Sequence, residues 1–377
     1  MITKQKRPRS AYRPPRPRHA PGTRPTDEVQ EGGAQIVPDY APGLFVQPAE
    51  IYGWLLSEIV EWAQVRPDAL PRQRVGRVRH LGSRWIPDGQ VLSLVGERGA
   101  GKTWLLRHLA DGEPQLLGRA TYIDLATRTA FSEPHSFVRF LEGRIQGQRR
   151  EGRSILLLDN VPPQMDNHLR AVETAILKPH LEEHGSLVIM ALADPARVCW
   201  LTPALRGGDV GHLVPFSPSQ TREQLNRLRK IDALRSGIRP SQIYRASRGL
   251  PFLNYLLATH SHRRSFELLL DYWLEGMSND EHGQMRILLQ AICTLEVLEH
   301  AKVQAALDLY RLRRPGVGEH QAHPAQVRNL VRHGLARSLP QSPGRVTLVP
   351  SVRRAAAGML QDYDPELYTA LQAMAAG

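Results

Sequence analysis

One stretch constrains the fold of this 377-residue chain more than any other. Gly96–Thr103, with the sequence GERGAGKT, matches G-x-x-x-x-G-K-[ST], the phosphate-binding loop. The apolar run at 91–95 predicts a buried strand before the loop, and 104–109 predicts the first turns of a helix after it. The motif requires a strand, a glycine-rich loop and a helix in this order. The sequence therefore predicts a P-loop fold.

The chemistry of a bound triphosphate accounts for the residue types in this loop. Glycines let backbone N–H groups curl around an anion without Cβ clashes, and the helix N-terminus adds a partial positive charge. We expect the Lys102 ammonium to reach the β- and γ-phosphates and the Thr103 hydroxyl to ligate Mg²⁺. ATP is expected rather than GTP, because no Asn-Lys-x-Asp signature occurs. The predicted nucleotide-binding residues here are Gly96, Gly99, Ala100, Gly101, Lys102, Thr103 and Trp104.

Further apolar runs alternate with helical stretches after the loop. They predict strands at 120–125, 154–159, 186–192 and 212–216. This alternation is typical of an α/β fold whose parallel sheet is covered by helices on both faces. Ligands of such sheets bind at the carboxyl ends of the strands, where Asp159 and Asp194 are expected to lie.

Asp159 ends an apolar run, as the Walker B carboxylate does, and we expect it to hold Mg²⁺ through water. The next residue is Asn160, where many ATPases of this class have a glutamate that polarises water. An amide cannot act as a general base, so hydrolysis should be slow or require a group from a partner. Asp194 is either a substitute for that base or a helix cap before Pro195.

Two arginines are candidates to stabilise the transferring phosphoryl group. Arg206 precedes the fifth predicted strand, and Arg197 follows the fourth. Either could reach a γ-phosphate in its own subunit or in a neighbouring one, or could be an ordinary surface residue. The predicted catalytic residues are Lys102, Asp159 and Arg206, with Thr103 and Asp159 as the metal ligands.

The rest of the chain is organised around this nucleotide-binding region. Ser217-Pro218-Ser219-Gln220 has the form of a capping box and predicts a helix start, and after 279 three helices and two short strands follow in winged-helix order. The predicted divisions are a disordered Pro/Arg-rich basic tail (1–46), a helical lead-in (47–90), a nucleotide-binding domain (91–218), a helical lid (219–278) and a winged-helix domain (279–377).

The net charge of +12 is unevenly distributed. Residues 1–26 carry eight Lys and Arg and no acid, and residues 221–354 carry 21 against 11 Asp and Glu. Such an excess favours acidic partners such as DNA, although solubility alone would also explain it. No apolar run is long enough to span a membrane and no signal core occurs, so a cytoplasmic protein is expected. The predicted DNA contacts are Arg328, Arg332 and Arg345, with Gln326 and His333 on the same helix as the first two.

The ordered motifs resemble those of STAND ATPases, the signal-transduction branch of the AAA+ group that includes the NB-ARC switches. Val75-Gly76-Arg77 is similar to the hhGR segment, Leu156–Asn160 to the Walker B motif and Gly249-Leu250-Pro251 to the GxP motif of the lid. The resemblance implies that Gly76 and Arg77 contact the adenine region and that Pro251 lies near the base. Val349-Pro350-Ser351 stands where NB-ARC proteins have Met-His-Asp, so their ADP-sensing histidine is absent.

Three functions are compatible with these features. The first is a slowly hydrolysing, ATP-binding switch that couples nucleotide state to self-association or to a protein partner. The second is an AAA+ DNA-binding ATPase, similar to initiators or transposition regulators, that uses the winged helix and the basic tail. The third is a nucleotide-stabilised scaffold without hydrolysis.

Overall fold

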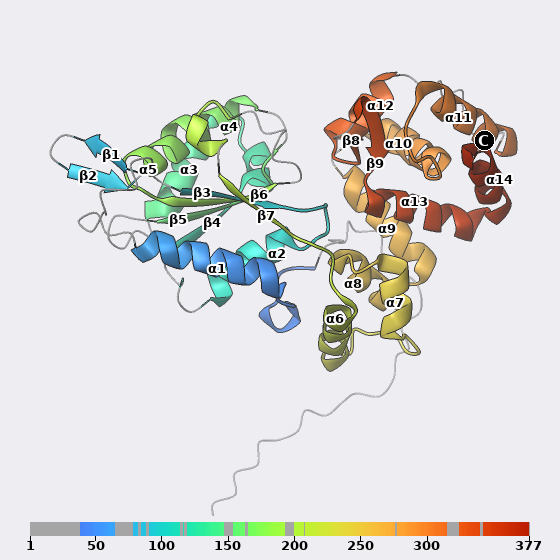
Figure 1. Ribbon diagram of the computed structural model, residues 1–377, viewed down its shortest axis with the longest axis horizontal. Coiled ribbons are helices and arrows are strands. Elements are labelled where there is room, and N and C mark those ends of the chain that lie inside the picture. Colours follow the sequence, from blue (N-terminus) through green and yellow to red (C-terminus); the bar gives the residue numbers. More distant parts are fainter. Residues whose placement is uncertain are drawn as a thin grey trace, which may run out of the picture. The chain divides into compact units, whose positions relative to one another are not determined.

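The structure is a computed structural model (Figure 1). It describes residues 38–64, 78–81, 84–87, 90–113, 116, 119–146, 154–162, 165–192, 200–206, 208–275, 277–314, 324–339 and 342–376. Val75-Gly76-Arg77, Asp194, Arg197 and the tail up to residue 37 lie outside these ranges, so the interpretations made of them stay predictions.

A five-stranded parallel sheet forms the centre of the nucleotide-binding region. Its strands are β3 (Gln90–Val95), β4 (Ala120–Asp124), β5 (Ile155–Asp159), β6 (Leu187–Leu192) and β7 (Asp209–His212). The spatial order is β4-β5-β6-β3-β7, so the strand that leads into the phosphate loop lies between β6 and β7 (Figure 1). Counted from β3 this is the order 2-3-4-1-5, which confirms the predicted α/β P-loop fold.

Helices cover both faces of this sheet, as the continuous apolar strands predict. One face packs against α1 (Ala49–Gln64) and α2 (Lys102–Arg107), and the other against α3 (Pro134–Gln146) and α4 (Asn167–Val172) (Figure 1). Leu92 belongs to the first apolar cluster and its neighbour Val91 to the second, because successive side chains of a strand point to opposite faces. The shorter helical segments are η2 (His108–Gly112), η3 (Leu125–Ala130), η4 (Glu173–Leu177), α5 (Lys178–Glu182) and η6 (Pro203–Leu205).

The fifth strand lies earlier than the sequence pattern predicts. We expected 212–216, whereas β7 spans Asp209–His212 and pairs with β3 from Leu92 to Val95. β7 is an edge strand and only its Gly211 is buried, so it carries no apolar run that would mark it. Helix α1 lies so close to Gly211 that a Cβ added there would overlap the Trp54 ring.

The lead-in contains a hairpin that the helical prediction for 47–90 missed. Strands β1 (Val78–Leu81) and β2 (Arg84–Pro87) pair antiparallel. Only Gly82 and Ser83 separate them in the sequence, and a two-residue connection that begins with glycine is typical of tight β-hairpins. Helix α1 (Ala49–Gln64), in contrast, lies within the predicted helical lead-in.

The carboxyl-terminal half is helical, with one hairpin. We call α6 (Pro218–Lys230), α7 (Pro240–Ser247), α8 (Pro251–Thr259) and α9 (His262–Leu274) the lid helices. The predicted capping box is present: Ser217 Oγ accepts from the Gln220 N–H, and the Gln220 side chain accepts from the Ser217 N–H. No helix among the described residues is long and apolar enough to cross a membrane.

Three helices and a hairpin follow the lid helices in the predicted order. They are α10 (Asn279–Ile292), α11 (His300–Arg313), α12 (Pro324–Arg332), and the antiparallel strands β8 (Ala336–Leu339) and β9 (Ser342–Leu348). Helices α13 (Pro350–Tyr363) and α14 (Pro365–Ala376) come last. Helix α13 packs against α9 at Gly358, where an added Cβ would lie 2.6 Å from the Phe266 ring.

Candidate nucleotide-binding site

The phosphate loop has the backbone that anion binding requires. Gly99 and Gly101 have φ angles of +91° and +95°, a region that L-residues with a Cβ rarely adopt. Gly101 is the N-cap of α2, and a Cβ built on it would meet no described atom within 4 Å. The loop is therefore open at the point where the helix N-terminus presents its free N–H groups, and it fits a phosphate.

Lys102 is folded back onto this loop. Its ammonium donates to the carbonyl oxygens of Gly96 at 2.6 Å and Glu97 at 3.0 Å. Burial of the ammonium lowers the pKa of Lys102 to about 8, although the nearby charge of Asp159 acts in the opposite direction. The lysine thus lies at the predicted site and close to Asp159, but it is bound to the loop itself.

Asp159 is held in place by two donors at the end of β5. The Tyr122 hydroxyl donates to its Oδ2 at 2.7 Å, and the Asn160 N–H donates to its Oδ1 at 2.9 Å. Only 2% of Asp159 is exposed, so these bonds orient a carboxylate that has little access to water. Thr103, in the first turn of α2, is the second predicted metal ligand. A hydroxyl, one carboxylate and phosphate oxygens suit Mg²⁺, which keeps several of its waters.

The surroundings of Asp159 include groups that sequence reasoning missed. Burial, and then the charge of Asp159, raise the pKa of Tyr122, and the Arg107 guanidinium lies 3.7 Å from the centre of its ring. The Asn160 amide donates to Asp124 Oδ1 at 2.9 Å, with Asn160 at a φ of +51°. In the β4–β5 register Asp124 lies opposite Asp159, so aligning the ends of these two predicted strands would have found it.

The lid helices contact the backbone of the phosphate loop. The Phe252 N–H, in the first turn of α8, donates to the Gly99 carbonyl at 3.2 Å. Arg98 and Trp273 form a reciprocal pair: Arg98 Nη1 donates to the Trp273 carbonyl at 3.1 Å, and Trp273 Nε1 donates to the Arg98 carbonyl at 3.3 Å. Pro251 opens α8 and is buried one residue from the first contact. The GxP segment therefore lies beside the loop.

Helix α13 also reaches this region. Arg354 Nη1 donates to the Ser247 carbonyl at 2.7 Å, at the end of α7. Burial lowers the pKa of Arg354, and the charge of Glu97 in the phosphate loop opposes this shift. Two residues after Ser247, Gly249 has a φ of +81°, and its carbonyl accepts from the Phe216 N–H at 2.8 Å. The turn at 247–249 thus contacts both α13 and the segment that follows β7.

Two predicted site residues have side-chain contacts outside the loop. Trp104 packs against Tyr40, with ring centroids 5.7 Å apart and an interplanar angle of 87°. The exposed Arg206 donates to the carbonyls of Trp200 and Leu201. It precedes β7, whose first residue pairs with Leu92, so it lies on the amino-terminal side of the sheet, opposite the loop. Arg206 does not reach the phosphates of its own chain, and only a role toward a neighbouring copy remains as a prediction.

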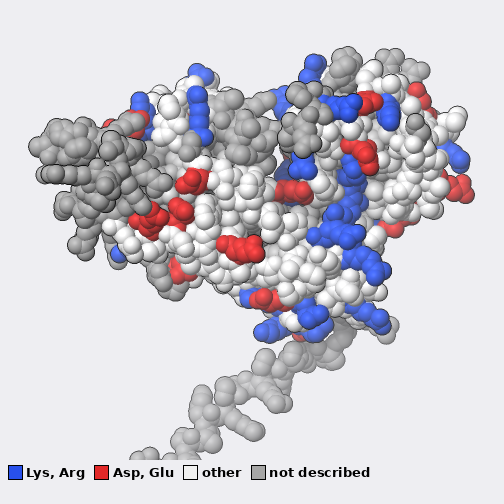
Figure 2. Space-filling model, in the orientation of Figure 1, with Lys and Arg blue, Asp and Glu red and all other residues white. Residues whose placement is uncertain are grey.

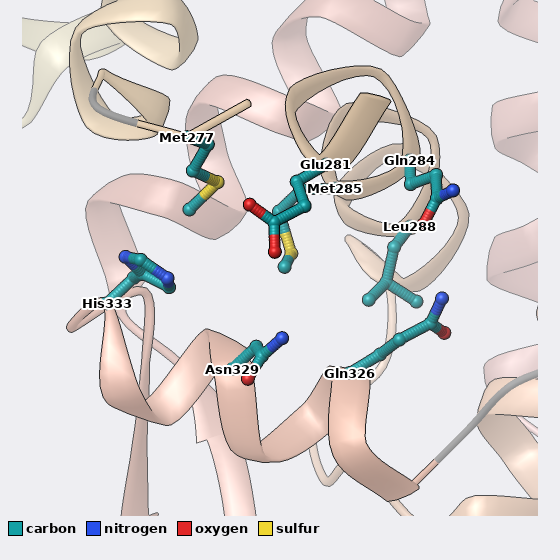
Figure 3. A pocket seen from close by; sticks show the side chains of 8 residues that line it. All are labelled: Met277, Glu281, Gln284, Met285, Leu288, Gln326, Asn329 and His333. Carbon is teal, nitrogen blue, oxygen red and sulfur yellow. The ribbon is translucent and has the colours of Figure 1, made fainter. Parts of the chain in front are cut away.

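The polar residues named on α12, the third helix of the predicted winged-helix region, divide into two sets. Arg328 and Arg332 are exposed, as is Arg345 on β9. Gln326 and His333 instead line a cleft between α12 and α10, where Figure 3 shows them opposite residues such as Glu281. Helical spacing puts Gln326 and His333 on the side of α12 that turns toward α10, whereas Arg328 and Arg332 face solvent, so the DNA contacts stay a prediction.

Comparisons with known proteins found likeness only among solved structures. No family model matches the sequence, and no curated protein matches it. A RuvB mutant of Thermotoga maritima aligns at 16% identity and a TM-score of 0.43, over 81% of this chain and 93% of that one. The Orc1 protein of Aeropyrum pernix, solved in complex with DNA, aligns at 16% identity and a TM-score of 0.37, over 89% of this chain and 96% of that one. Domain III of the replication initiation protein DnaA from Thermotoga maritima aligns at 19% identity and a TM-score of 0.33, over 63% of this chain and 90% of that one. Since these TM-scores lie below 0.5, the fold assignment depends on the sheet order and the phosphate loop.

Proposed function

We propose that this chain is an ATP-binding, slowly hydrolysing molecular switch of the STAND branch of the AAA+ group. Its nucleotide state would control self-association or the binding of a protein partner. One observation carries the proposal: the lid helices hold the backbone of the phosphate loop, through the reciprocal Arg98–Trp273 pair and the Phe252–Gly99 bond. Because the lid helices bond directly to the loop backbone, a ligand that changes the loop conformation can also change the position of the lid helices.

The position of Lys102 gives this response a physical cause. To reach the β- and γ-phosphates, its ammonium must leave the carbonyls of Gly96 and Glu97. These residues adjoin Arg98 and Gly99, which the lid helices contact. Phosphate binding therefore competes with one arrangement of the loop and favours another, and a ligand shifts a conformational equilibrium only through such differential affinity. Arg354, which bonds to the end of α7, would carry the change to α13.

Slow hydrolysis is part of the proposal. Mg²⁺, held by Thr103 and Asp159, would polarise the phosphates. At the position of the usual water-activating glutamate, the Asn160 amide donates to Asp124 and is no base. Arg206 is exposed and lies away from its own phosphate loop, and the proposal assigns it to the site of a neighbouring copy, so that hydrolysis would take place in an assembly. The proposed units are the nucleotide domain at 91–218, the lid at 219–278 and the winged helix at 279–377.

The direct test measures particle size by light scattering with saturating ADP and with a non-hydrolysable ATP analogue. The proposal expects different sizes for the wild type, or different capture of a partner, and no difference for Lys102→Ala. Identical behaviour of the wild type in both nucleotides would count against a switch. A single-turnover assay then distinguishes a slow ATPase from a scaffold that never hydrolyses its nucleotide.

A further inference from the structure

The positive charge of the carboxyl-terminal half is concentrated on the lid helices. The lid helices and their connections, residues 218–274 and all of them described, contain ten Lys and Arg against four Asp and Glu, an excess of six. Residues 279–377 contain eleven against nine, an excess of only two. Figure 2 shows a band of blue side chains over the part of the molecule that Figure 1 labels α6 to α9, and the band continues upward over the start of α13. The lid helices, rather than the winged-helix elements, therefore carry the basic surface.

Most of this charge faces solvent without a carboxylate partner. The exposed basic residues are Arg222, Arg229, Lys230, Arg235, Arg239, Arg245, Arg248, Arg263 and Arg264. Arg263 and Arg264 pair with Glu267, and the partly buried Arg227 pairs with Glu223. In the described part of the chain, none of the others lies within 4.0 Å of a carboxylate oxygen. Uncompensated like charge destabilises the fold through repulsion, and a bound polyanion removes that cost.

Contacts join the charges of successive helices into one surface. Arg235 Nη1, between α6 and α7, donates to the His260 carbonyl at 2.5 Å, between α8 and α9. Burial, and then the charges of Arg264 and Arg235, lower the pKa of His260, so both arginines lie close to that ring. Burial lowers the pKa of Arg354 in α13, and the charge of Arg248, at the end of α7, likewise lowers it. The surface is thus built from several helix ends.

We propose that this surface of the lid helices binds the phosphodiester backbone of duplex nucleic acid. Nine of its ten basic residues are arginines, whose planar guanidinium groups bind phosphate oxygens in pairs. Among residues 217–264 the exposed large apolar side chain is Ile231, so the surface lacks the apolar face that a membrane-binding helix inserts. Contacts to phosphates carry no base information, so binding is independent of sequence. The basic residues of this surface are not those that contact the phosphate loop, although both sets belong to the lid helices.

The test compares two matched double variants of the full chain. Arg239→Glu/Arg245→Glu changes two exposed arginines of the lid surface, and Arg328→Glu/Arg332→Glu makes the same charge change on the exposed side of α12. Fluorescence anisotropy measures binding to a random-sequence DNA duplex and to an RNA duplex of equal length, across a salt series and without ATP. The basic tail is common to all variants. Thermal melts verify folding, and Arg239→Gln/Arg245→Gln gives a milder second lid variant.

The lid variant should bind at least about tenfold more weakly, and the slope of log affinity against log salt should become shallower by about two, one unit for each lost phosphate contact. The α12 variant should keep its affinity within about twofold. An unchanged lid variant, or an equal loss in the α12 variant, overturns the proposal. So does tighter binding of poly-glutamate or of anionic phospholipid vesicles than of either duplex. Unchanged duplex binding by Lys102→Ala is also expected, so the proposal can fail or hold independently of the switch.

Discussion

The affinity for ATP should fall as pH rises above about 8, because Lys102 must be protonated to bind phosphate. In the free protein, burial holds the pKa of Lys102 at about 8. A bound triphosphate raises that pKa, since it adds negative charge beside the ammonium. Affinity is therefore at its maximum well below pH 8 and has begun to fall at pH 8, where about half of the lysine is deprotonated. It is lost from there upward, until the pH reaches the raised pKa of the complex.

The size of this effect follows from the fraction of lysine that is protonated. At about pH 9, one unit above the pKa, roughly one tenth of the free protein carries the proton. Binding then costs about 1.4 kcal/mol more, which is about a tenfold rise in Kd. A single proton limits the slope to about tenfold for each further pH unit.

Isothermal titration calorimetry of ATP binding with Mg²⁺ from about pH 7 to pH 9.5 measures this dependence, and it also reports proton uptake above pH 8. Lys102→Arg is the matched control: its guanidinium stays protonated, so its Kd should be higher but flat over the same range. If the wild type gives a flat Kd as well, either the ammonium is not desolvated in the free loop or it does not bind the phosphates. The reasoning about the folded-back lysine would then be refuted.

Two further predictions concern stability. Gly249→Ala should lower the free energy of unfolding by about 2–4 kcal/mol, because a Cβ at its φ of +81° is strained and overlaps the Phe216 carbonyl. The control is Gly53→Ala, which is exposed in α1 with open space around it and should leave the free energy of unfolding unchanged or slightly raised. Tyr122→Phe should cost about 1–3 kcal/mol, since it removes a hydroxyl donor from the buried Asp159 carboxylate. Urea titrations measure all three, and a Gly249→Ala midpoint equal to the wild type, or no loss in Tyr122→Phe, would contradict the respective argument.

The sequence predicted the buried parts of the fold because buried strands and helices need apolar residues at regular positions, and these positions are visible in the sequence. Strands β3 to β6 are continuous apolar runs, and the lid helix α6 has a capping box at Ser217. Strand β7 was misplaced because an edge strand with one buried glycine leaves no such run. The hairpin of β1 and β2 was missed although Gly82-Ser83 marks a tight turn.

The candidate site was only partly predictable for a different reason. The loop and Asp159 were found because their residue types are fixed at short spacing. The Arg98–Trp273 pair joins residues 175 positions apart, and no local pattern predicts such a contact. Arg206 was assigned by its place before a strand, but the sequence alone did not show that it lies at the opposite end of the sheet from the loop. The basic charge was located only as an average over 221–354, which hid its concentration on the lid helices.

The central claim is that the lid helices change conformation with the nucleotide bound at the phosphate loop. Hydrogen exchange tests it most directly. Deuterium uptake is compared with ADP and with a non-hydrolysable ATP analogue at saturation, in peptides covering 250–260 and 270–275. The account predicts a clear difference between the nucleotides in these peptides. It predicts no difference in Lys102→Ala, and a smaller one in Arg98→Ala, which keeps the glycines and Lys102 of the loop but lacks the guanidinium bond to Trp273. Identical exchange in both peptides, with both nucleotides shown to be bound, would contradict the account.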